Sequence, residues 1–77
     1  MDALEPVLAK VRAYAQLREK KRGSFYRKGR GFLHFHDDPA GLFADLSIGA
    51  ENIRLRVSTR AEQKALLAKI QEVLRDG

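Results

Sequence analysis

The sequence predicts an α+β fold in which two helices pack on one face of a four-stranded antiparallel meander, in the order α-β-β-β-β-α. Apolar residues recur at helical spacing near both ends of the chain, and four short segments of alternating apolar and polar residues lie between them. The connections between those segments are too short for the crossovers that parallel strands require. With 77 residues, we expect a single domain over residues 1–77 with a small core.

The first helix is expected over residues 3–21. Asp2 and Glu5 have the spacing of a capping box, and Gly23 is a helix-ending residue just after a basic stretch at 20–22. Basic side chains at a helix C-terminus interact favourably with the helix dipole. The apolar stripe of this helix comprises Leu4, Val7, Leu8, Val11, Tyr14 and Ala15.

The second helix is expected over residues 60–75. Thr59 and Glu62 form a T-x-x-E capping box immediately before an apolar stripe. The stripe comprises Leu66, Leu67, Ile70, Val73 and Leu74.

Four strands are expected between the helices, and the lengths of their connections predict a register. The strands are 24–28, 31–36, 42–48 and 53–57, joined by turns at 29–30, 38–41 and 49–52. Apolar residues from all four then share the face under the helices. This inner face comprises Tyr26, Leu33, Phe35, Leu42, Ala44, Leu46, Ile48, Ile53, Leu55 and Val57.

The same register predicts rows of side chains on the open face of the sheet. One row runs Phe25, His34, Asp45, Arg56; a second runs Arg27, Phe32, Ser47, Arg54; and His36 lies beside Phe43. Three phenylalanines on an open face require a reason, because large exposed apolar patches usually mark an interaction site.

The histidines raise the question of a metal. His34 and His36 share a strand face about 7 Å apart, and Asp45 is a cross-strand neighbour, so a His-His-Asp set is one interpretation. Because Asp45 is also expected beside Arg56, an ion pair is the first interpretation of that carboxylate. Asp38 is expected to begin the Asp-Pro-Ala-Gly turn. We therefore predict no metal site, and keep a His/Asp metal-binding protein as the second alternative.

Catalysis has little support in the sequence. The hydroxyl nucleophiles of the serine and threonine type are Ser24, Ser47, Ser58 and Thr59, and none lies in a nucleophile-elbow motif. The chain has no phosphate-binding P-loop and no G-x-G-x-x-G motif. We predict a non-catalytic protein with no cofactor.

The charge pattern favours an anionic partner. The chain carries a net charge of +5, and the stretch 18–30 holds seven of its fifteen basic residues, with two aromatic rings among them. Cations that follow phosphates and rings that stack on bases are typical of single-stranded nucleic-acid binding, to RNA or DNA. The predicted contact residues are Lys20, Lys21, Arg22, Phe25, Arg27, Lys28, Arg30, Phe32, Phe43, Arg54 and Arg56.

The alternative function is a homodimeric protein-interaction module. A second copy laid on the open sheet face, or paired along an edge strand, would cover the exposed phenylalanines and enlarge a small core. The sequence has no cysteine, no apolar run of membrane-spanning length and no signal-peptide pattern at its N-terminus. We therefore expect a soluble cytoplasmic protein that does not enter a membrane.

Overall fold

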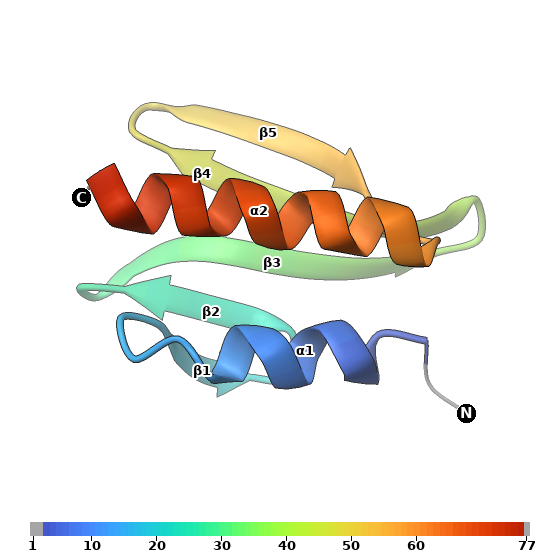
Figure 1. The fold of residues 1–77 in the computed structure, drawn as a ribbon, viewed down its shortest axis with the longest axis horizontal. Coiled ribbons are helices and arrows are strands. Elements are labelled where there is room, and N and C mark those ends of the chain that lie inside the picture. The colour runs from blue at the N-terminus through green and yellow to red at the C-terminus, as the bar shows by residue number, and fades with distance from the viewer. Residues whose placement is uncertain (1–2, 77) are drawn as a thin grey trace.

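A computed structural model describes residues 3–76, and it confirms the α+β class with one strand more than the four predicted. Two helices lie on one face of an antiparallel sheet whose strand order is β1-β2-β3-β4-β5 (Figure 1). The elements are α1 (Glu5–Arg12), β1 (Arg18–Lys21), β2 (Ser24–Arg27), β3 (Arg30–Asp38), β4 (Gly41–Ile48), β5 (Glu51–Arg56) and α2 (Arg60–Asp76).

The first helix is much shorter than predicted, because turns follow Arg12 and residues 18–21 form an edge strand. The apolar stripe of α1 ends at Val11, and the sequence 18–22 is charged throughout, so it has no face with which to cover a sheet. Instead its backbone pairs with β2. The expectation that 20–22 form a helix C-terminus is therefore wrong, and Asp2, the expected cap, lies outside the described residues.

A fork of hydrogen bonds ties β1 back to α1. The guanidinium of Arg12 donates to both carboxylate oxygens of Glu19, at 2.6 and 3.2 Å, and to Glu5 at 2.7 Å. The second oxygen of Glu19 also accepts from the backbone N–H of Gly23, in the turn that joins β1 to β2. One carboxylate thus fixes both the helix and the turn.

The turn between β2 and β3 is one residue earlier than predicted, and a bulge follows it. Lys28 and Gly29 both have positive φ, as a two-residue type I′ hairpin turn requires. Beyond the bulge, Phe25 pairs with Leu33. A one-residue change of register turns a side chain to the other face, so Phe25 lies under the helices and Tyr26 on the open face. The predicted inner position of Tyr26 and open-face position of Phe25 are wrong.

The hairpin of β3 and β4 has the predicted register, although its loop is shorter than expected. Asp37 pairs with Leu42, so His34 faces Asp45 as predicted. Asp38 begins the turn, where its carboxylate accepts from the N–H of Ala40 at 2.9 Å. The loop between β4 and β5 is also only two residues long, and this shorter loop changes the register of β5.

Because Ile48 pairs with Glu51 and not with Ile53, β5 is displaced by two residues relative to the prediction. Asp45 therefore lies opposite Arg54, and Phe43 lies opposite Arg56. A displacement of two keeps every side chain on its predicted face, so the core is unchanged while the neighbours in each row are different.

The core lies between the helices and the inner face of the sheet, and α2 begins at its predicted cap. The Thr59 hydroxyl accepts from the N–H of Glu62, whose carboxylate accepts from the N–H of Thr59 in return. The fully buried large side chains are Val7, Leu8, Val11, Phe25, Leu46, Val57, Leu66 and Ile70. No helix within residues 3–76 combines the length and the apolar character needed to cross a membrane.

Candidate functional site

The open face of the sheet is hollowed into a concavity of about 500 Å³. Side chains from the four strands β2 to β5 line it, so it runs across most of the sheet. The polar groups in its wall come from Ser24, Tyr26, His34, His36, Asp45, Ser47, Asn52 and Arg54.

A chain of polar contacts crosses this concavity. Arg54 donates two hydrogen bonds to Asp45, at 2.9 and 3.2 Å, and Nε2 of His36 lies 2.7 Å from the same carboxylate. Arg54, and to a smaller extent His36, hold the pKa of the Asp45 carboxyl below its ordinary value. The predicted partner of Asp45, Arg56, instead lies 3.8 Å from Glu62 of α2. The structure thus brings together a His–Asp–Arg row, but it contains His36 and Arg54 where the sequence predicted His34 and Arg56.

His34 has a separate partner. Its Nδ1 lies 2.6 Å from the hydroxyl of Ser24, a residue that is itself buried. The rings of His34 and His36 pack edge to face, with centroids 4.5 Å apart. The sequence argument missed Ser24 as a partner because it placed Phe25 there, and only the bulge brings the serine opposite His34.

Two of the three predicted stacking rings are not available to a ligand. Phe25 is 1% exposed and packs edge to face with Phe35 in the core. Phe32 is 5% exposed, and the guanidinium of Arg27 lies 6.0 Å from its ring centroid. Phe43 remains half-buried, with Arg54 over its ring at 5.8 Å. The argument for a dimer through the open face rested on three exposed phenylalanines, and two of them are already buried within the monomer.

The basic residues of the predicted site separate into paired and unpaired groups. Arg22, Arg54 and Arg56 each face a carboxylate, of Glu5, Asp45 and Glu62 respectively. No carboxylate of the described residues makes an ion pair with any of six other cations around β1 and the β2–β3 hairpin. We call these six the basic cluster: Arg18, Lys20, Lys21, Arg27, Lys28 and Arg30.

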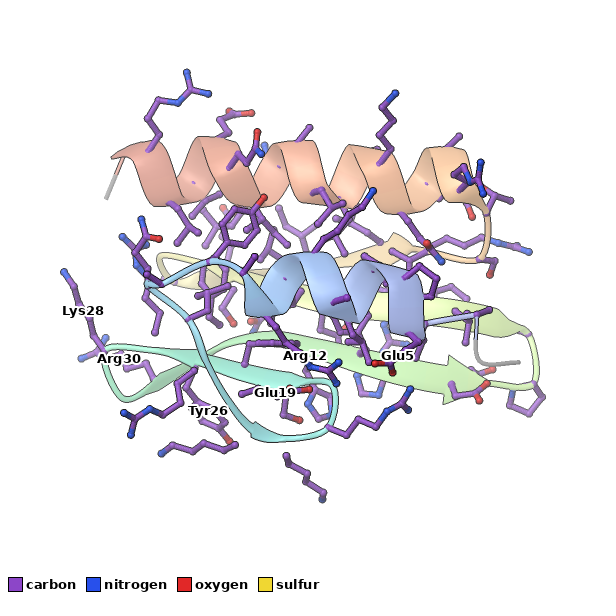
Figure 2. All side chains as sticks on the ribbon, turned by 60° about the horizontal axis from the view of Figure 1, so that its bottom comes forward. Glu5, Arg12, Glu19, Tyr26, Lys28 and Arg30 are labelled. Carbon is purple, nitrogen blue, oxygen red and sulfur yellow. The ribbon has the colours of Figure 1, made fainter. Side chains whose placement is uncertain are left out.

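Tyr26 is the aromatic ring of the basic cluster. It is half-buried on the open face, and the ammonium of Lys20 lies 4.7 Å from its ring centroid. Together with Arg18 and Lys28 these residues line a groove of about 520 Å³ between β1 and the hairpin tip. In Figure 2, Lys28 and Arg30 project from that tip, whereas Glu5, Arg12 and Glu19 gather beneath α1. The sequence argument missed Arg18 and Tyr26 as site residues, because 18 was assigned to a helix and 26 to the core.

No set of three or more histidine and acidic side chains within the described residues converges as a metal centre. Both oxygens of Asp45 are already occupied by Arg54 and His36. Comparison with family models, with curated proteins and with solved structures gives no match, so no relative suggests a function for either surface.

Proposed function

We propose that the protein is a non-catalytic module that binds single-stranded nucleic acid through the basic cluster. The observation that supports it is the gathering of six cations around β1 and the β2–β3 hairpin without carboxylate partners among the described residues. A basic side chain already paired with a carboxylate adds little to the affinity for a phosphate. An unpaired one releases a condensed counterion from the nucleic acid when it binds, and that release raises the affinity.

Tyr26 distinguishes this surface from other basic surfaces of the chain. A second groove, between α1 and α2, is lined by Lys10, Arg60 and Lys64, but its other walls are aliphatic or amide side chains. A base needs a ring on which to stack, and each stacked base contributes about 1–3 kcal/mol. The groove beside Tyr26 therefore combines both elements of single-strand recognition, with phosphates on Lys20, Lys28 and their neighbours.

The predicted site consequently changes in composition. Lys20, Lys21, Arg27, Lys28 and Arg30 stay in it, and the structure gives reason to add Arg18 and Tyr26. The residues of the prediction that we leave out are Arg22, Arg54 and Arg56, which are paired, and Phe25 and Phe32, which are buried. Phe43 lies at the far end of the sheet face and is a secondary contact.

The test is binding of a fluorescent oligonucleotide at a series of salt concentrations. We expect affinity to fall steeply with salt, with a slope of about −0.7 for each phosphate contacted. The variant Arg27→Ala/Lys28→Ala/Arg30→Ala should flatten that slope and lose at least tenfold in affinity. Tyr26→Leu should weaken binding without changing the slope, because it removes stacking and no charge.

The matched control is Arg60→Ala/Lys64→Ala/Arg75→Ala, which removes the same net charge from α2 on the opposite side of the sheet. It should keep most of the affinity. Equal losses in the two triple variants would show that binding follows net charge alone, and the absence of binding at low salt would reject the function.

A homodimer formed through β5 is a second candidate, favoured by the exposed edge of the sheet. β5 is the last strand of the sheet, so one side of its backbone has no strand partner. Beside it, Ile53 and Leu55 line an apolar groove of about 240 Å³ with Leu66 of α2. Antiparallel pairing with Ile53 at the two-fold axis places Asn52 opposite Arg54 of the second copy and avoids opposed like charges. Sedimentation of the wild type and of Asn52→Pro would test it, because the N–H of Asn52 points away from β4 toward the free edge, whereas that of Ile53 points toward β4. A monomer at high concentration rejects it.

A further inference from the structure

His34 and His36 present two imidazoles to the same concavity. They are two residues apart on β3, so both side chains project from the open face of the sheet. Their ring centroids are 4.5 Å apart, with an interplanar angle of 67°. The basic cluster does not include them, although Tyr26 lines the same concavity.

Each imidazole has one nitrogen held by a partner and one free of partners among the described residues. Asp45 binds Nε2 of His36 and so leaves Nδ1 available. Ser24 binds Nδ1 of His34 and leaves Nε2 available. When the carboxylate and the hydroxyl accept these hydrogen bonds, each free nitrogen carries a lone pair. A metal-binding histidine has this arrangement, in which the second nitrogen donates to an outer group that fixes the tautomer and the ring orientation.

The distance between the rings fits two ligands of one ion. A metal lies about 2.0–2.1 Å from its imidazole nitrogen, which puts it about 3.2 Å from the ring centroid. Two imidazoles at a right angle around one ion then have centroids about 4.5 Å apart, and at a tetrahedral angle about 5.2 Å. The observed 4.5 Å equals the right-angle value, so the separation of the rings is compatible with both imidazoles binding one ion.

No carboxylate is expected as a third ligand of an ion bound by the two imidazoles. Asp45 is the nearest acidic side chain in the row, and Arg54 and His36 occupy its oxygens. No set of three convergent histidine and acidic groups lies within residues 3–76. Water would complete the coordination, as the open concavity permits. Two nitrogen ligands with open positions favour the ion with the highest intrinsic affinity for imidazole, and among divalent ions that order is Cu²⁺ ahead of Ni²⁺ and Zn²⁺.

We propose that His34 and His36 form a two-histidine site for a divalent late transition-metal ion, with Cu²⁺ preferred, in which Ser24 and Asp45 are positioning residues. The site is solvent-open and exchangeable. It differs from the His-His-Asp set that the sequence suggested, because Asp45 orients a ligand and does not bind the ion.

Titration of the protein with Cu²⁺, followed by calorimetry and by electron paramagnetic resonance, tests the site. We expect one ion per chain, with hyperfine structure from two nitrogen ligands, and weaker binding of Ni²⁺ and Zn²⁺. His34→Gln and His36→Gln should each lower the affinity at least about tenfold and remove one nitrogen from the spectrum. Asp38→Asn, an exposed carboxylate of the β3–β4 turn, is the control and should leave both unchanged.

The positioning role of Ser24 is tested by comparing the affinity for Cu²⁺ with the number of nitrogen ligands in the spectrum. Ser24→Ala should weaken Cu²⁺ binding by about tenfold while the spectrum still shows two nitrogens, because the ligand stays and only its orientation is lost. If His36→Gln destabilises the sheet by removing one of the two partners of Asp45, His34→Gln gives the same test without touching that carboxylate. Binding that is equal in the wild type and in His34→Gln, or that does not saturate below ~1 mM, overturns the proposal.

Discussion

Asp45 lies directly opposite Arg54 on the open face and accepts two hydrogen bonds from its guanidinium, at 2.9 and 3.2 Å. The same carboxylate receives Nε2 of His36 from the strand on its other side. One residue of β4 therefore connects three strands, and the length of the β4–β5 turn decides which arginine lies opposite it. A turn two residues longer would have placed Arg56 there.

The first prediction concerns this pair. We expect a double-mutant cycle of Asp45→Asn and Arg54→Ala, measured by urea unfolding, to give a coupling free energy of no more than about 1 kcal/mol. The pair is partly exposed, with 59% of the Arg54 and 32% of the Asp45 side chain accessible, so water screens it. The matched cycle with Arg56→Ala should give no coupling. Coupling to Arg56 would contradict the register of β5.

Phe25 provides the second prediction. It is 1% exposed among core residues, so Phe25→Ala should lower the free energy of unfolding by about 3–5 kcal/mol. Phe43→Ala, in a half-buried ring on the open face, should cost clearly less. Chemical denaturation of both variants checks the order. Two outcomes would contradict this and support the predicted ligand contact of Phe25. One is an equal loss of stability in both variants; the other is a mild loss in Phe25→Ala together with loss of oligonucleotide binding.

The same residue shows which parts of the fold follow from sequence patterns. Alternation of apolar residues located four strands and the inner face of β3 to β5, and the capping box located the start of α2. Those signals are local. The position of the β2–β3 turn depends on which residues adopt positive φ, and the bulge at Phe25 depends on packing against β3, so neither is encoded by period alone.

The strand β1 was missed for a related reason. The sequence "REKKR" has no apolar alternation, and β1 exists through backbone pairing at an edge together with the Glu19–Arg12 contact. The concentration of basic residues in 18–30 could be read from the sequence, but which of them lack a carboxylate partner could not. Which arginine of β5 pairs with Asp45 depends on the register, and the predicted register of β5 was off by two residues.

The cap of α2 gives the third prediction. Thr59→Ala removes the hydroxyl that accepts from the N–H of Glu62 and should lower the free energy of unfolding by about 1 kcal/mol. Thr59→Ser keeps an accepting oxygen at the same place and should retain most of that stability. Thermal unfolding of the two variants side by side checks it. An equal loss in Ser and Ala would assign the effect to the methyl group and not to the cap.

The fourth prediction is a pH dependence that comes from Glu19. The guanidinium of Arg12 holds the pKa of the Glu19 carboxyl below its ordinary value of about 4.5, and the backbone N–H of Gly23 adds to this. A carboxyl whose pKa is lower in the folded state stabilises the fold above its unfolded pKa, and that stability is lost as the pH falls toward and through the folded value. We therefore expect the free energy of unfolding to decrease as the pH is lowered below about 4.5.

The control for this dependence is Glu19→Gln, which keeps the shape of the side chain but cannot titrate. It should be less stable than the wild type at neutral pH and should show a smaller decrease in acid, because part of the wild-type loss is already present. Glu5 also has a lowered pKa through Arg12 and Arg22, so some acid sensitivity remains in the variant. Guanidinium unfolding between neutral and acid pH measures both curves, and parallel curves would show that Glu19 does not link β1 to α1.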